Sequence, residues 1–133
     1  MSKARAILGI IAGLSLILSS AAHSFLGWKQ LRTELEQIQA PSDLILGVAV
    51  GWHFGGIAML ALGCIMISLF VNRLKRRNPS PFPALVVAVA YLGFGTWALV
   101  VSKLNPFFMV FIVPGVLLAI AALPSTTHRT PSR

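Results

Sequence analysis

Two histidines are the residues of this 133-residue sequence whose type and position could do chemistry. His23 and His53 each lie inside a long run that contains no Asp, Glu, Lys or Arg. Ionisable side chains in such segments are rare and mark candidate functional sites. A neutral imidazole can ligate haem iron or another metal through one ring nitrogen, and it can also carry protons. The pair therefore suggests a haem or metal site, a proton or quinone-type site, or hydrogen bonds that join two helices.

The cofactor alternative requires the two imidazoles to converge, and haem b is the group that such a pair would hold. Counting along the runs places His53 about 10 Å deeper than His23. No third ligand is evident, because Cys64 lies about 16 Å from His53 along a helix axis. The hydrogen-bonding alternative pairs each imidazole with a hydroxyl or a backbone carbonyl of a neighbouring helix, and the missing ligand favours it.

The composition indicates the environment that surrounds these histidines. The chain is 56% hydrophobic and 11% charged, which is too little polar surface to cover a soluble globule. A helix needs about 20 apolar residues to cross a bilayer, and helices satisfy their own backbone there. The sequence has four apolar runs: Ala6–Leu26, Leu44–Val71, Pro83–Ser102 and Phe107–Leu123. They predict an all-α, four-helix transmembrane bundle that forms one domain over residues 1–123, followed by a disordered cytoplasmic tail at 124–133.

The charged residues predict the orientation of the bundle. All three acids, Glu34, Glu36 and Asp43, lie between the first and second runs. Eight of the eleven basic residues lie on the other side: Lys3, Arg5, Arg73, Lys75, Arg76, Arg77, Arg129 and Arg133. The positive-inside rule then places both termini in the cytoplasm of a bacterial inner membrane. The net charge of +8 indicates a partnership with anionic lipids near Arg73–Arg77 and excludes nucleic acid, which would need a soluble core.

The segment between the first two runs has helical periodicity. Trp28, Leu31, Leu35 and Ile38 form an apolar stripe, and charged residues fill the opposite side. The pattern predicts an amphipathic helix in the outer interface of the membrane, which ends before Pro41. An alternative is a signal peptide cleaved after Ala22, but the first run is longer than the usual apolar region of about 7–15 residues.

Small residues predict where the helices meet, because transmembrane helices associate by close packing. The second run carries the double GxxxG pattern Gly47, Gly51 and Gly55. The third run carries a seam that includes Ala88, Tyr91 and Gly95, and the first has a face with Gly9, Ala12, Leu16, Ser19 and His23. The patterns favour a compact bundle that could also bind a membrane-protein partner or a second copy.

Missing residues exclude several classes of small membrane protein. No carboxylate lies inside a run, as small multidrug transporters require, and no Gly-x-Ser-Gly supplies a rhomboid-type nucleophile. The single cysteine cannot form the CxxC of quinone-epoxide reductases. The sequence therefore favours a non-enzymatic membrane subunit or binding protein. A haem-binding or metal-binding redox protein that uses His23 and His53 is the alternative.

Two short motifs add a resemblance. Residues 22–27 read Ala-His-Ser-Phe-Leu-Gly, and residues 52–53 read Trp-His. The combination resembles a group of small uncharacterised four-helix bacterial inner-membrane proteins, in which Gly-His-Ser-x-Leu-Gly ends the first helix and Trp-His lies in the second. The resemblance covers roughly residues 20–60, with Ala22 in place of the usual glycine. It implies a bacterial source and a shared role for His23, Trp52 and His53, but no reaction.

Overall fold

The structure, a computed structural model, describes residues 3–123, and over that range it contains helices and no strands. The predicted tail at 124–133 lies outside the described residues. The elements in chain order are α1 (Lys3–Ala21), the π-helix η1 (Ala22–Gly27), α2 (Trp28–Gln37), α3 (Ser42–Leu74), α4 (Phe82–Val101), the 3₁₀-helix η2 (Pro106–Phe108) and α5 (Met109–Ala122). The all-helical prediction is therefore confirmed.

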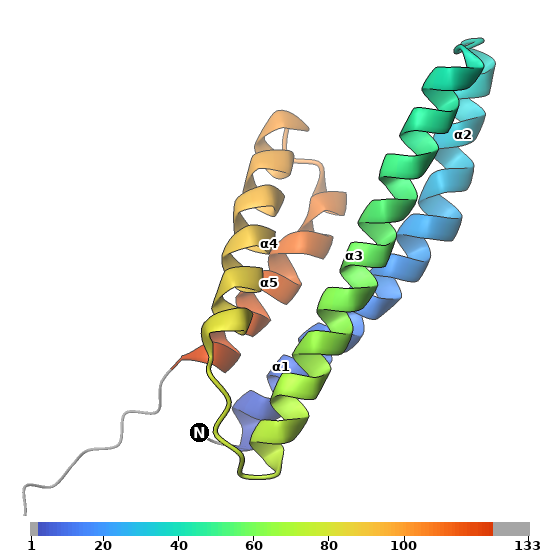
Figure 1. Ribbon diagram of the computed structural model, residues 1–133. Coiled ribbons are helices and arrows are strands. Elements are labelled where there is room, and N and C mark those ends of the chain that lie inside the picture. The colour runs from blue at the N-terminus through green and yellow to red at the C-terminus, as the bar shows by residue number, and fades with distance from the viewer. Residues whose placement is uncertain (1–2, 124–133) are drawn as a thin grey trace, which may run out of the picture.

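A long hairpin dominates the molecule. Helices α1, η1 and α2 form one unbroken helix of 35 residues, which runs antiparallel to the 33-residue α3 (Figure 1). At 1.5 Å per residue each arm is about 50 Å long. Helices α4 and α5 form a shorter hairpin against the half of the long one that holds the N-terminus, so α2 and the start of α3 project beyond it (Figure 1). We call α2, residues 38–41 and residues 42–51 the tip.

Three helices are long and apolar enough to cross a membrane: the α1–α2 helix, α3 and α4. The fourth predicted span corresponds to the apolar helix Pro106–Ala122, in which the first turn is the 3₁₀-helix η2 and the α-helical part, α5, has 14 residues. A span of this length is at the lower limit for a bilayer. The sequence predicted the existence of this helix but overestimated its regular part.

The core lies where the two hairpins meet. Its largest fully buried side chains are Leu16 of α1, Met66 and Phe70 of α3, and Leu118 of α5. The arms of the long hairpin approach closely because small residues recur every seventh position, with Ala6, Gly13 and Ser20 on α1 and Gly56 and Gly63 on α3. A Cβ atom on Gly63 would lie 2.8 Å from the backbone oxygen of Gly13. Only glycine permits this crossing.

Two arginines join the hairpins at the end opposite the tip. Arg73 donates to the backbone oxygen of Ala121 at 3.4 Å, and Arg5 donates to that of Leu123 at 3.1 Å. These carbonyls end α5, where the helix leaves acceptors unpaired and carries partial negative charge. The guanidinium of Arg73 also lies 5.3 Å from the centre of the Phe70 ring. Arg5 and Arg73, which the sequence pattern used only to predict the orientation of the bundle, thus also cap a helix.

The structure gives the amphipathic segment a different position from the predicted one. Instead of turning to lie across the end of the bundle, α2 continues the line of α1 alongside α3 (Figure 1). Trp28, Leu31 and Leu35 of the apolar stripe are partly buried, whereas the charged side chains are exposed. The physical reason is that η1 carries the backbone hydrogen bonding through to α2, while the apolar start of α3 offers a surface for the stripe.

The double GxxxG prediction needs a correction. A Cβ atom on Gly47 or Gly51 would meet no atom of the described chain within 4 Å, so these glycines do not pack against another helix of the chain. Gly55 does face η1, since its Cβ would lie 3.3 Å from the imidazole Nε2 of His23. The α4 seam is different, because Ala88, Tyr91 and Gly95 are all buried. Spacing identifies a small-residue face but not the neighbour that it meets.

Candidate functional site

The candidate site is built around η1, the only π-helical segment of the described residues. Its six residues, Ala22–Gly27, are those of the first short motif. A π-turn widens the helix and is often found at functional sites. Its last residue, Gly27, lies against the indole of Trp52, and a Cβ at this position would lie 2.9 Å from the indole Cζ2. The motif is therefore the part of the first helix that accommodates α3.

His23 and Trp52 form a reciprocal pair across the long hairpin. Their rings are stacked, with centroids 4.2 Å apart and planes inclined by 6°. The indole Nε1 of Trp52 donates to the backbone oxygen of His23 at 2.7 Å. The Nε2 atom of His23 lies 3.0 Å from the backbone oxygen of Trp52. Because a carbonyl only accepts, Nε2 carries the proton and donates, and the lone pair of the neutral ring is on Nδ1.

Two serines extend this polar contact along the same face. The hydroxyl of Ser20 donates to the backbone oxygen of Gly56 at 2.7 Å and is buried. The hydroxyl of Ser24 packs directly on Gly56, at the place where any larger residue would carry its Cβ. Ser20 and His23 therefore find their partners on the backbone of α3, and Gly56 provides the space for Ser24.

His53 has a different environment. Its ring lies 5.5 Å from that of Trp28, with the planes inclined by 59°, and the residue is exposed. Each histidine thus contacts a tryptophan of the opposite arm, which places His23 level with Trp52. The depth difference of about 10 Å that the sequence suggested for His23 and His53 is therefore absent. The reason is that the first helix continues past Gly27 and the two arms pair antiparallel.

The cofactor alternative can be tested against this geometry. Haem ligation through Nε2 of His23 would break its hydrogen bond to Trp52, and the indole already covers one face of the imidazole. His53 contacts Trp28 instead of joining His23. Among the residues that the structure describes, no three His, Cys, Asp or Glu side chains gather as a metal site. The residues present do not fit a bis-histidine haem or a metal in this arrangement, whereas His23 fits the hydrogen-bonding alternative.

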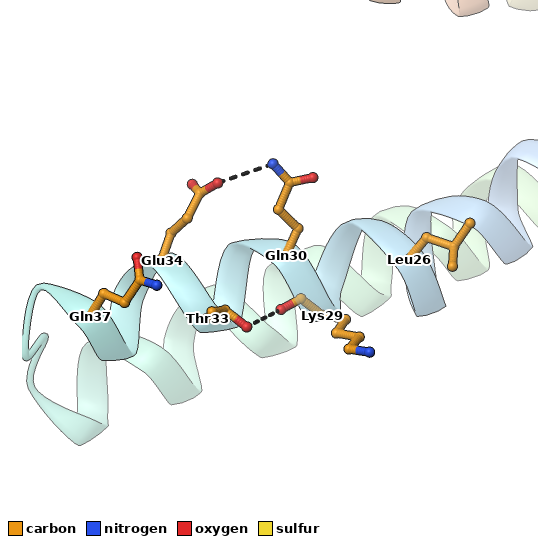
Figure 2. Close-up of a pocket in the computed structure, with 6 residues that line it drawn as sticks. All are labelled: Leu26, Lys29, Gln30, Thr33, Glu34 and Gln37. Atoms are coloured by element: carbon orange, nitrogen blue, oxygen red, sulfur yellow. Dashed lines mark hydrogen bonds between the residues drawn. The ribbon is translucent and has the colours of Figure 1, made fainter.

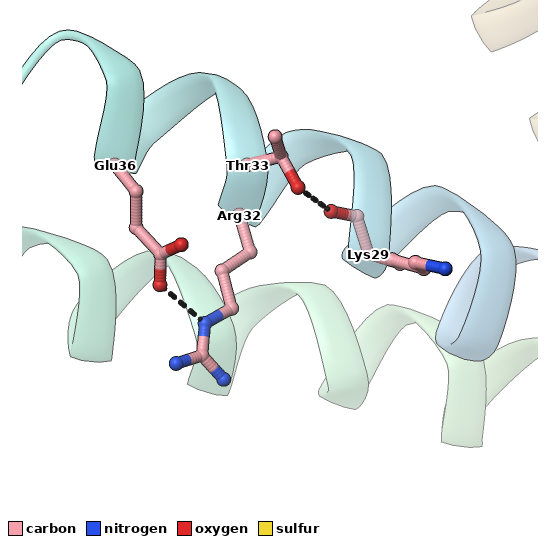
Figure 3. Close-up of polar contacts among 4 residues, drawn as sticks. All are labelled: Lys29, Arg32, Thr33 and Glu36. Atoms are coloured by element: carbon pink, nitrogen blue, oxygen red, sulfur yellow. Dashed lines mark hydrogen bonds and ion pairs between the residues drawn. The ribbon is translucent and has the colours of Figure 1, made fainter.

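The tip has one polar and one apolar face. A shallow groove of about 440 Å³ follows the outer side of α2, and Figure 2 shows the side chains that line it: Leu26, Lys29, Gln30, Thr33, Glu34 and Gln37. Its polar contacts join neighbouring turns of one helix, with Gln30 donating to Glu34 at 3.1 Å. Arg32 and Glu36 form an exposed ion pair at 2.8 Å (Figure 3). Such pairs contribute little to stability, so this face is a solvated helix surface.

The apolar face of the tip belongs to α3. Leu46 and Val50 of the tip are 66% and 64% exposed, and Phe54, which follows it on α3, is 71% exposed. Gly47 and Gly51 lie among them, on the side of α3 that faces away from the first helix. Within the described chain α3 packs mainly on α1 and contacts α4 little, and these three side chains remain exposed.

Sequence reasoning identified His23 and His53 but missed Ser20, Gly27 and Gly56 as parts of the contact. The signal that would have found them is the heptad spacing of small residues, with Gly13, Ser20 and Gly27 on one arm. A sustained period of seven brings the same face of a helix back to its partner, whereas a GxxxG pattern is shorter and more common.

Comparisons of the chain with protein-family models, with curated proteins and with solved structures find no match. The resemblance based on residues 22–27 and 52–53 therefore stays a prediction, and a functional proposal has to rest on the contacts of this chain.

Proposed function

We propose that the chain is a four-pass protein of a bacterial cytoplasmic membrane that acts as a non-enzymatic subunit. Both termini lie in the cytoplasm, and the tip of the long hairpin binds a helix of another membrane protein on the outer side. The separation of charge supports this orientation, because all three acids lie in or beside the tip and none lies at the other end. The apolar helices and the length of α4 support the membrane assignment.

The observation that carries the proposal is the exposed apolar face of the tip. Helix α4 has 20 residues, which matches a hydrocarbon core of about 30 Å. Each arm of the long hairpin is about 20 Å longer than that, so the tip extends beyond the hydrocarbon. Leu46 and Val50 would then face water, which is unfavourable for a contiguous apolar surface. A partner helix would bury them, and Gly47 and Gly51 would allow its backbone to approach.

The non-enzymatic part of the proposal rests on the His23–Trp52 pair. A general base or a metal ligand needs a nitrogen that can reach substrate or metal. The Nε2 atom of His23 instead donates to a backbone oxygen and its ring is stacked on the indole, which leaves only Nδ1 with a lone pair. The pair therefore holds the arms in register and presents the tip. We assign it a structural role.

Photo-crosslinking in native membranes tests the tip. A photoreactive phenylalanine analogue at Val50 is expected to form adducts with one protein of defined mass, which is identified by mass spectrometry. The same analogue at Gln30, which is exposed on the polar side of α2, is the matched control and should give few adducts. An adduct with a second copy of the chain would identify the partner as a homo-oligomer. Absence of protein adducts from Leu46, Val50 and Phe54 alike would refute the proposed docking face.

The cofactor alternative has its own measurement. Detergent-solubilised protein is expected to show no Soret absorbance and no stoichiometric metal by elemental analysis. A Soret band that disappears in the His53→Ala variant would overturn the structural role of the histidines and favour a redox protein.

A further inference from the structure

A second hollow lies at the opposite end of the molecule from the tip. It is an open groove of about 410 Å³ lined by Cys64, Ile65, Ser68, Leu69 and Pro79. Four of these residues belong to α3, and Pro79 belongs to the loop between α3 and α4. Helix α3 packs mainly on α1, and α4 packs mainly on α5, while α3 and α4 contact each other little. The groove therefore lies between the last turns of α3 and the loop that leads from α3 to α4.

The loop that borders this groove is strongly basic. Lys75, Arg76 and Arg77 follow directly after α3, and all three are exposed. No acidic residue occurs in the sequence after Asp43, so the local charge is not compensated by nearby carboxylates. Arg76 has a φ of 60° and ends the helix, and the amide of Arg77 donates back to the backbone oxygen of Asn72. The three cations therefore lie on the same loop as Pro79, which lines the groove.

Arg73 differs from these three because its guanidinium is used inside the protein. It donates to the backbone oxygen of Pro79 at 3.3 Å, as well as to the end of α5. The first of these bonds holds the loop wall of the groove against α3. Arg73 thus positions the groove, and Lys75, Arg76 and Arg77 are exposed beside it. Of these three, Arg77 also donates to Oδ1 of Asn72 at 3.3 Å.

We propose that this groove and the basic loop beside it bind an anionic phospholipid. Its phosphate lies against Lys75, Arg76 and Arg77, and one acyl chain follows the groove past Leu69 and Ile65. Basic pockets between transmembrane helices on the cytoplasmic side are a known setting for anionic headgroups. The occupant is a lipid and not free phosphate because the groove that continues from the cations is apolar. This inference rests on the membrane orientation proposed above but not on any partner at the tip.

Native mass spectrometry of the full chain in detergent tests the headgroup contact. The chain is expected to retain phosphatidylglycerol at least tenfold more than phosphatidylcholine at equal concentration. A Lys75→Gln, Arg76→Gln, Arg77→Gln variant should lose this preference. The matched control, Lys29→Gln with Arg32→Gln, removes two exposed cations from the tip and should keep it. Equal retention of the two lipids by the native chain, or an unchanged preference in the triple variant, would overturn the proposal.

A second variant tests the acyl chain. Ser68→Phe fills the groove and should shorten the retention of phosphatidylglycerol about tenfold, whereas Thr96→Phe on the exposed side of α4 should not. Inorganic phosphate added in excess should not displace the lipid from the native chain. If Ser68→Phe has no effect, or phosphate competes fully, the groove does not hold a lipid. Circular dichroism establishes that each variant is folded, and the crosslinking result at Val50 is independent of all these outcomes.

Discussion

The arms of the long hairpin and the arms of the short hairpin are joined by different interactions. In the long hairpin, hydrogen bonds from Ser20, His23 and Trp52 cross between the arms at 2.7–3.0 Å. In the short hairpin, Gly95 and Gly115 admit the neighbouring helix, and aromatic rings fill the space between, as in the edge-to-face contact of Phe94 and Phe111 at 4.9 Å. Hydrogen bonds have one geometry at which they form, whereas apolar contacts tolerate small shifts. The long hairpin therefore has the more strictly specified register.

The two hairpins also differ in whether a buried hydroxyl group has a hydrogen-bond partner. The hydroxyl of Ser20 is paired with a carbonyl of the opposite arm. The hydroxyl of Tyr91, also buried, has no hydrogen-bond partner in the described structure. An unpaired buried polar group costs about 1–3 kcal/mol. Polar side chains therefore join the arms of the long hairpin but not those of the short one.

The largest effect is expected where the arms of the long hairpin cross. Gly63→Leu places a side chain against the backbone oxygen of Gly13 and should lower the free energy of unfolding by about 3 kcal/mol. Gly51→Leu is the matched control, since nothing in the described chain lies near that position, and it should change stability little. Unfolding in detergent, followed by circular dichroism, measures both. Similar losses in the two variants would mean that the crossing is not where the structure has it.

A smaller effect is expected from the hydrogen bonds themselves. His23→Phe keeps an aromatic ring on Trp52 but removes the donor, and it should lower the free energy of unfolding by about 0.6–1.7 kcal/mol. His53→Phe is the control, because His53 is exposed and its described contact is a ring contact with Trp28. The same unfolding assay compares them. Equal losses would remove the distinction between the two histidines on which the structural role of His23 depends.

The smallest change should have the opposite sign and belongs to the short hairpin. Tyr91→Phe removes the unpaired hydroxyl while it keeps the ring next to Phe111, so we expect stability to rise by up to about 1 kcal/mol. Ser20→Ala removes a paired hydroxyl and should lower it by a similar amount. Thermal unfolding in detergent gives both signs. A loss of stability in Tyr91→Phe would show that the hydroxyl has a partner and that the hairpins do not differ in this respect.

Part of the candidate site could be predicted from the sequence. His23 and His53 stand out because they are ionisable residues in apolar runs, and Trp52 stands beside one of them. The pairing of His23 with Trp52 could not be predicted, because it depends on where the first helix ends. The sequence pattern of Trp28 to Ile38 favoured a separate helix, whereas the π-turn at Ala22–Gly27 continues the first helix past the site. That continuation brings His23 level with Trp52.

The packing glycines show the same limit. Gly47 and Gly51 have the spacing of a packing motif, but they face outward, and Gly56 and Gly63 make the contact with the first helix. Spacing reveals that one face of a helix consists of small residues. It does not reveal which of two small faces on α3 meets α1, because that choice depends on the side chains of the partner and on the register between them.

The sequence by itself determined that the chain is helical, that its apolar runs can cross a membrane and that its charges are concentrated at opposite ends. These properties follow from composition and from the need of each segment to satisfy its own backbone, so they are local. The tertiary structure alone decided that His23 joins Trp52, that Arg73 caps α5 and that the tip of α3 is uncovered. Those outcomes depend on how far each helix continues and on which faces of different helices meet, and neither is encoded within any single segment.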